Sequence, residues 1–262
     1  MKNLKLLFSY IRYKLFARTE HSIHSPFIFD FLTNVLNDDS NYYAYNLIED
    51  IRKKMLNDRT TINFQDFGAG SKKFQTNQRP IHTIVKYGIS KKKFAELYFR
   101  IINRYNLRTG IELGTSLGLT ACYLGNANSK FELFTIEGCS DLANYSRNIF
   151  NELNLKNIHS IHGTFDDELP KLIQQIPSLD FFFIDGNHRY DSTIRYFQLG
   201  LDKINENSIF IFDDIRWSEE MVRAWEDIKS HEKVKASIDL FYVGIVFFNS
   251  CFREKEDFII KF

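Results

Sequence analysis

The sequence has few cysteines, almost no net charge and no long apolar run. Its three cysteines are scattered over 262 residues, without a CxxC pair or a spacing typical of a zinc site or disulfide framework. Thirty-four basic and 33 acidic side chains leave a formal charge of +1, so no overall field favours nucleic acid. Lys5, Arg12 and Lys14 interrupt the apolar opening segment, so we expect neither a membrane span nor a secretion signal there. These absences predict a cytoplasmic protein with no nucleic-acid partner.

The first 65 residues have the pattern of helices. FIFDFLTNVLN (27–37) and YAYNLIEDIRKKML (43–56) place apolar residues at three- and four-residue spacing, which predicts a helical cap over residues 1–65. The opening segment carries five positive and no negative side chains before Glu20, interleaved with Leu, Phe and Tyr. It could therefore lie on an anionic membrane surface or pack against another subunit of a homo-oligomer, and packing is the interpretation we favour.

Residues 66–93 lack a clear period. They are polar and basic and contain Gly68, Gly70, Pro80 and Gly88, so the pattern predicts a loop or lid. The main domain is then expected over residues 94–262.

From about Ser90 the chain alternates short apolar strands with helical stretches. The expected strands are GIEL, FELFTIE, NIHSIHG, LDFFFID, SIFIFDD, and two closing strands around KASIDL and YVGIVFF. Short strands separated by helices indicate parallel βαβ units covered on both faces, and the last two, without a helix between them, indicate an antiparallel hairpin. The expected fold class is α/β: a doubly wound, seven-stranded, mostly parallel sheet with a terminal hairpin and an N-terminal helical extension.

The segment GIELGTSLG, residues 110–118, turns from strand into helix, where ligands bind in open parallel sheets. Gly114 and Gly118 allow unusual dihedrals and close approach of a ligand, and Glu112 sits where a carboxylate could meet an ammonium group. A dinucleotide fingerprint would need glycine at Ser116, which disfavours a pyrophosphate. About twenty residues after the glycine turn, Glu137 ends the next strand, where an acid can accept hydrogen bonds from both ribose hydroxyls.

A second cluster is expected at the ends of the fourth and fifth strands. LDFFFIDGNH delivers Asp185 and His188, and SIFIFDD delivers Asp213 and Asp214. Three carboxylates at one edge repel each other unless they are protonated or bound to a cation, so we expect Asp185, Asp213 and Asp214 to hold a divalent metal such as Mg²⁺. The metal would lower the pKa of a substrate hydroxyl, and His188 would remove its proton.

In this ordered set of motifs the sequence resembles the class I S-adenosylmethionine-dependent methyltransferases, and among them the catechol-type and macrolide-sugar O-methyltransferases, from about Ser90 to Phe248. The resemblance implies a Rossmann-like sheet with S-adenosylmethionine as cofactor. The methionine end of the cofactor would meet Glu112, Gly114, Thr115, Ser116 and Gly118, and Asp185 would also contact the cofactor. Glu137 would bind the ribose, and Gly163, Thr164 and Phe165 would border the adenine. The DGxH pattern of the sugar-modifying branch matches better, because catechol-type enzymes place a lysine where this chain has His188.

The expected activity is methyl transfer to a hydroxyl of a small molecule, with Asp185 and His188 at the catalytic centre. Two alternatives stay open. One is a nucleic-acid or protein methyltransferase of the same fold, against which stand the neutral net charge and the lack of an NPPY-like motif. The other is a non-catalytic module that keeps the cofactor fold and uses the N-terminal helices as an interaction surface.

Overall fold

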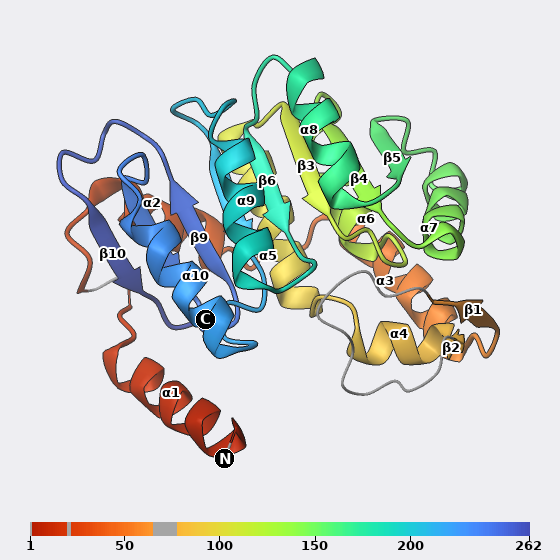
Figure 1. The fold of residues 1–262 in the computed structure, drawn as a ribbon, viewed down its shortest axis with the longest axis horizontal. Helices are drawn as coiled ribbons and strands as arrows, with labels where there is room; N and C mark the ends of the chain where they lie inside the picture. Colours follow the sequence, from red (N-terminus) through yellow and green to blue (C-terminus); the bar gives the residue numbers. More distant parts are fainter. Residues whose placement is uncertain (1, 20–21, 65–77) are drawn as a thin grey trace. The chain divides into compact units, whose positions relative to one another are not determined.

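A computed structural model describes residues 2–19, 22–64 and 78–262, and the chain divides into two compact units. Unit 1 consists of residues 1–38 and 178–262, and unit 2 of residues 39–177. Each unit has its own parallel strands with helices between them (Figure 1). None of the described helices is both long and apolar enough to cross a membrane.

Unit 2 contains three parallel strands in the order β3, β4, β5 (Figure 1). These are β3 (Thr109–Leu113), β4 (Glu132–Glu137) and β5 (Ile158–His162), with β1 (Thr61–Asn63) and β2 (Gln78–Pro80) as a separate antiparallel pair. The helices are α3 (Tyr43–Asn57), α4 (Ile81–Tyr87), α5 (Lys92–Tyr105), α6 (Leu119–Asn126), α7 (Ser140–Glu152) and α8 (Phe165–Gln175). Helices α6 and α8 contact β4, and α7 contacts β5, so the connections between parallel strands pack back onto the sheet.

Unit 1 contains five strands in the order β10, β8, β9, β7, β6. These are β6 (Phe181–Ile184), β7 (Ile209–Phe212), β8 (Ala236–Asp239), β9 (Gly244–Phe247) and β10 (Glu256–Ile259). The helices are α1 (Lys2–Phe16), α2 (Pro26–Phe31), the π-helix η2 (Leu32–Leu36), α9 (Tyr190–Gly200) and α10 (Glu219–Ser230). Strands β6 and β7 are parallel and fully buried, which explains their uninterrupted Phe and Ile composition.

The seven strands expected from the sequence are all present, and β8 and β9 form the expected antiparallel hairpin. An eighth strand, β10, was not expected; it pairs parallel to β8. The loop or lid expected over residues 66–93 is wrong for residues 78–87, which form β2 and α4. Gly88 follows α4 as its C-terminal cap, so the glycine marks a helix end rather than a loop. Residues 65–77 lie outside the described part of the chain.

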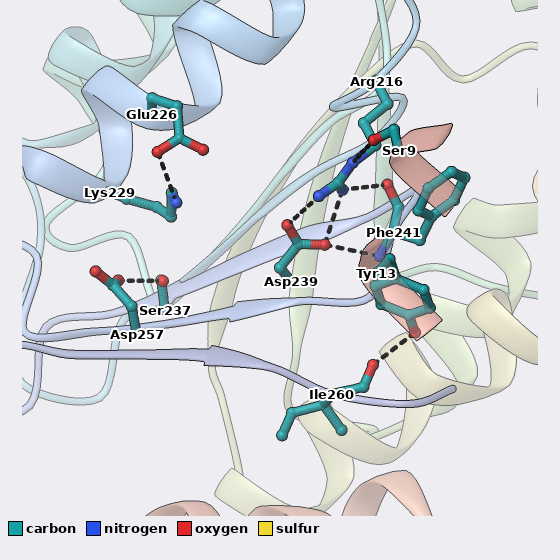
Figure 2. A network of polar contacts seen from close by, with 10 residues as sticks. All are labelled: Ser9, Tyr13, Arg216, Glu226, Lys229, Ser237, Asp239, Phe241, Asp257 and Ile260. Carbon is teal, nitrogen blue, oxygen red and sulfur yellow. Dashed lines mark hydrogen bonds and ion pairs between the residues drawn. The ribbon is translucent and has the colours of Figure 1, made fainter. Parts of the chain in front are cut away.

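Helix α1 is fastened to unit 1 by one side. The Tyr13 hydroxyl donates to the Ile260 carbonyl at 2.6 Å, and the Arg216 Nε donates to Ser9 Oγ at 3.3 Å (Figure 2). The backbone of Arg18 pairs in parallel with that of Ile260, just after β10. The N-terminal helix thus depends on the last strand of the chain for its place.

Arg216, which is half-buried, and Asp239, which is buried, form a bidentate ion pair beside α1 (Figure 2). The two guanidinium nitrogens lie 2.8 and 2.6 Å from the Asp239 carboxylate oxygens, and the side chains are 16% and 7% exposed. Arg216 also donates to the Phe241 carbonyl, and Asp239 accepts the Phe241 amide N–H. Arg216, on the connection after β7, is thereby tied to the β8–β9 turn.

We predict that Asp239→Asn lowers the free energy of unfolding by about 3 kcal/mol, because it leaves a largely buried guanidinium without its counter-charge. The matched control is Glu226→Gln. Glu226 pairs with Lys229 at 2.9 Å but is 61% exposed (Figure 2), so its loss should cost less than about 1 kcal/mol. Urea unfolding measures the loss of unfolding free energy in each variant, and equal losses in the two would contradict a special role for the Arg216–Asp239 pair.

Candidate functional site

The turn after β3 is built on left-handed backbone. Gly114 has φ 103°, Ser116 has φ 50°, and Gly118, the N-cap of α6, has φ 82°. A Cβ on Gly118 would lie 2.8 Å from the Phe150 ring and 2.9 Å from Ser146 Cβ. Glycine at 118 is therefore required both by dihedral angle and by space, and α7 can pack tightly behind the turn.

Glu137, at the end of β4, holds this turn in place. Its Oε2 accepts the Ser116 N–H at 2.8 Å and its Oε1 accepts the Cys139 N–H at 2.9 Å. Burial raises the pKa of Glu137, while the backbone N–H donors oppose that rise by favouring the carboxylate. The Gly138 N–H also acts on this carboxylate, and since each oxygen accepts about two hydrogen bonds, Glu137 keeps capacity for one further donor.

Glu112 lies beneath the turn with no exposed surface. Its Oε2 accepts the Thr135 hydroxyl, which in turn accepts the Thr115 hydroxyl, and its Oε1 has no hydrogen-bond partner among the described residues. Desolvation raises the pKa of Glu112 to about 8; the Thr135 hydrogen bond lowers it and the charge of Glu137 raises it. A buried carboxyl with an unsatisfied oxygen is suited to a nearby cation, such as an ammonium group, that would favour its ionised form.

Thr135 is a site-supporting residue that the sequence reasoning missed. It sits in the middle of β4, where a β-branched residue is the ordinary strand former, so nothing in the pattern marked it. Only the pairing of β3 with β4, which sets Thr135 opposite Glu112, reveals its role.

The segment after β5 is organised by a helix cap. Thr164 is the N-cap of α8, and its hydroxyl oxygen accepts the Asp167 N–H at 3.2 Å. The Gly163 N–H donates to the Glu137 carbonyl at 3.0 Å, which ties this segment to the end of β4, and Phe165 is half-buried as the first residue of the helix. Gly163, Thr164 and Phe165 therefore lie beside the Glu137 segment, and their contact with an adenine stays a prediction.

In unit 1, the predicted catalytic pair follows β6. Asp185 comes one residue after the strand, and its Oδ1 lies 3.7 Å from His188 Nε2, an ion-pair distance longer than a hydrogen bond. The His188 ring also lies 6.4 Å from the Trp217 ring, and both Asp185 and His188 are half-buried. The sequence prediction that these two side chains approach each other is thus met in the structure.

Asn187 fixes the loop that carries His188. Both residues have positive φ, 67° and 39°, in a conformation that costs a non-glycine residue energy unless the surroundings enforce it. The Asn187 amide supplies that support by donating to Ser192 Oγ at 3.0 Å and to the Tyr196 hydroxyl at 3.1 Å. Asn187 is a second residue that sequence reasoning missed; the signal was an asparagine, which tolerates left-handed backbone, beside the histidine.

Asp213 and Asp214 follow β7, next to Asp185. The Asp213 N–H donates to the Ile184 carbonyl at 3.0 Å, so the β6 and β7 ends are neighbours as expected. Asp213 Oδ1 accepts the Asp214 N–H at 2.8 Å. Burial raises the pKa of Asp214, and the positive charge of His188 opposes that rise.

The side chains of the three expected metal ligands, Asp185, Asp213 and Asp214, do not converge on one point in the structure. Within residues 2–19, 22–64 and 78–262, no group of three or more His, Cys, Asp or Glu side chains is placed to hold a metal ion. Asp185, Asp213 and Asp214 share two neighbouring strand ends without forming such a group. Metal binding at these residues stays a prediction of the sequence.

The fold is similar to that of known methyltransferases. Residues 111–215 match a family model described as a methyltransferase domain, and no curated protein sequence matches the chain. A Podospora anserina methyltransferase bound to S-adenosylhomocysteine gives a TM-score of 0.60 at 13% identity, over 87% of this chain and 98% of that chain. The Streptomyces achromogenes O-methyltransferase TomG, involved in tomaymycin synthesis and bound to S-adenosylmethionine, gives 0.59 at 14% identity, over 89% and 99%. A Bacillus cereus O-methyltransferase in complex with S-adenosylhomocysteine gives 0.55 at 15% identity, over 85% and 96%. At such identities the likeness shows the fold alone.

We predict that Glu112→Gln flattens the dependence of stability on pH. Because the pKa of Glu112 is raised to about 8 in the folded chain, the folded state keeps a proton that the unfolded state loses near the ordinary pKa of 4.5. Stability therefore falls as pH rises from about 4.5 through about 8, by on the order of a few kcal/mol, and glutamine removes this loss. Urea unfolding between pH 5 and 9 measures it. Exposed Glu132→Gln is the control, and parallel profiles for wild type and Glu112→Gln would contradict the assignment.

Proposed function

We propose that this protein transfers a methyl group from S-adenosylmethionine to a hydroxyl of a small molecule, because residues 111–215 match a methyltransferase-domain model and the chain has a Rossmann-like methyltransferase fold. The observation that carries the proposal is the glycine turn after β3, held by the Glu137 carboxylate. The O-methyltransferase names of the Bacillus cereus and Streptomyces achromogenes proteins support oxygen as the accepting atom.

The cofactor half of the reaction belongs to unit 2. The Glu137 carboxylate would accept a ribose hydroxyl at the position that the backbone N–H groups of Ser116, Gly138 and Cys139 leave open. Gly114 and Gly118 keep side-chain atoms away from the turn, so a ligand can approach its backbone. Glu112, with its raised pKa, would ionise as the cofactor's ammonium group approaches and so balance the added charge.

The acceptor half belongs to unit 1. When bound, S-adenosylmethionine would supply the methyl group: a C–O bond to the acceptor oxygen would form as the C–S bond breaks, and S-adenosylhomocysteine would leave. His188 takes the hydroxyl proton, and Asp185, 3.7 Å from its Nε2, stabilises the imidazolium that results. Asn187 keeps His188 in its left-handed loop, so the base is positioned before the substrate arrives.

A divalent cation is part of the proposal on sequence grounds. Carboxylates at two neighbouring strand ends fit a hard cation in chemical type, although the side chains as placed do not form a three-ligand group in the part of the chain that the structure describes. Asp185, Asp213 and Asp214 would hold it. When bound there, Mg²⁺ would lower the pKa of the acceptor hydroxyl.

We predict that Glu137→Ala weakens S-adenosylhomocysteine binding at least tenfold, because both the ribose contact and the support of the Ser116 N–H are lost. The control is Glu132→Ala, at the exposed start of the same strand, where the carboxylate pairs with His159. Isothermal titration calorimetry compares the three proteins. Absence of binding by the wild type would favour a non-catalytic module.

A radiolabelled methyl-transfer screen of phenols, sugars and RNA then tests the acceptor class, and labelling of RNA alone would overturn the small-molecule assignment.

We predict that the chemical step needs both His188 and a divalent cation. His188→Gln should lower kcat by about 10²- to 10⁴-fold, the range for losing a general base, with cofactor affinity unchanged. EDTA should abolish turnover and excess Mg²⁺ restore it, and Asp213→Asn should weaken that restoration. His162→Gln, on β5, is the control for histidine loss. Full turnover in EDTA would remove the metal from the mechanism, and full turnover of His188→Gln would remove the base.

A further inference from the structure

Helix α1 turns most of its apolar side chains away from the unit that holds it. Tyr13 is 3% exposed and Ser9 is half-buried, and these two residues, four apart, mark the docked side of the helix. Figure 2 shows both beside Phe241 and Arg216. Everything on the opposite side of α1 is available to a partner.

That opposite side carries a continuous apolar stripe, which we call the outer stripe: Leu7, Phe8, Ile11 and Leu15. Their exposed fractions are 52%, 64%, 45% and 76%. At about 100° per residue, these positions fall within an arc of about 100° that is centred opposite the docked side. Four large apolar side chains in one exposed patch are unusual on a soluble surface and mark an interaction site.

The charges beside the outer stripe select the partner. On a helical wheel Lys14 borders one side of the stripe and Arg12 the other, and both are exposed. Lys14 Nζ lies 5.4 Å from the Tyr10 ring, so its stem runs along the helix flank and its charge stays at the edge. Residues 1–19 contain no acidic side chain, so a second copy of α1 would bring cations together without a counter-charge. The negative charge that balances Arg12 and Lys14 must therefore come from a partner other than a second α1.

We propose that α1 lies flat in the surface of an anionic membrane, with the outer stripe among the acyl chains and Arg12 and Lys14 against the headgroups. An apolar face bordered by Lys and Arg is the pattern of an interfacial helix. The helix has 15 residues, which is shorter than the roughly 20 needed to span a bilayer, so insertion is parallel to the surface. The docked side, held by Tyr13 and Arg216, stays bound to the protein.

The test is co-sedimentation of the full chain with vesicles of phosphatidylcholine alone or with 30% phosphatidylserine, roughly the anionic range of cytoplasmic leaflets. We expect at least tenfold tighter binding to the anionic vesicles, weakened by high salt. Ile11→Glu with Leu15→Glu should abolish binding, and Arg12→Glu with Lys14→Glu should weaken it at least tenfold. The control is Val222→Glu, an equally exposed apolar position on α10, which should bind as the wild type does.

Because the outer stripe is exposed, these variants should keep the circular dichroism and unfolding midpoint of the wild type. Failure of the wild type to bind anionic vesicles overturns the proposal, as does equal binding to neutral and anionic vesicles. A dimer in analytical ultracentrifugation that Ile11→Glu with Leu15→Glu converts to monomer, without vesicle binding, would assign the stripe to a second copy instead. Each outcome is independent of whether the chain transfers methyl groups.

Discussion

The site depends on how buried parallel strands leave their sheets. A parallel strand whose faces are both covered must turn sharply at its carboxyl end, and after β3, β6 and β7 the turn contains left-handed backbone. Gly114, Ser116 and Gly118 make it after β3, Asn187 and His188 after β6, and Asp214 after β7. Only glycine adopts this conformation without cost, so the four other residues must be held by their surroundings. Of these residues, His188 is the proposed base, and Gly114 and Gly118 leave the turn open to a ligand.

The hydrogen bonds around Glu137 and Glu112 determine how each carboxyl group can act on a ligand. Glu137, at the end of β4, holds the turn after β3 through the Ser116 N–H, and the further N–H groups of Gly138 and Cys139 favour its ionised form. Glu112 has no backbone donor and one unsatisfied oxygen, so its raised pKa responds to any cation placed near it. The two glutamates, on adjacent strands, thus have different roles because their hydrogen-bond partners differ. Glu137 acts as a hydrogen-bond acceptor, and Glu112 changes its ionisation when a cation is placed near it.

The sequence was sufficient for features that depend on local pattern. Apolar runs of strand length located all seven expected strands, and Gly118 and Glu137 were recognised because strand-end position and spacing are sequence properties. It was insufficient where pairing across the chain decides. Strand β10 has only four residues and mixed burial, so no period marks it. Thr135 and Asn187 act through hydrogen-bond partners that only the folded chain brings near. In the sequence Asp239 is an ordinary acidic residue at a strand end, and only the structure shows its ion pair with Arg216.

The Arg216–Asp239 pair also connects the two proposals that concern unit 1. Arg216 lies two residues after Asp214, on the connection that leaves β7, and its guanidinium contacts Ser9 of α1 as well as Asp239 (Figure 2). The β7 exit and the N-terminal helix are therefore held by one side chain. A helix that lies on a membrane through its outer stripe would fix the β7 exit at a constant depth below that surface. An acceptor that partitions into the headgroup region would then be presented to the Asp185 and His188 side of the unit at a raised local concentration, without any additional contact from the protein.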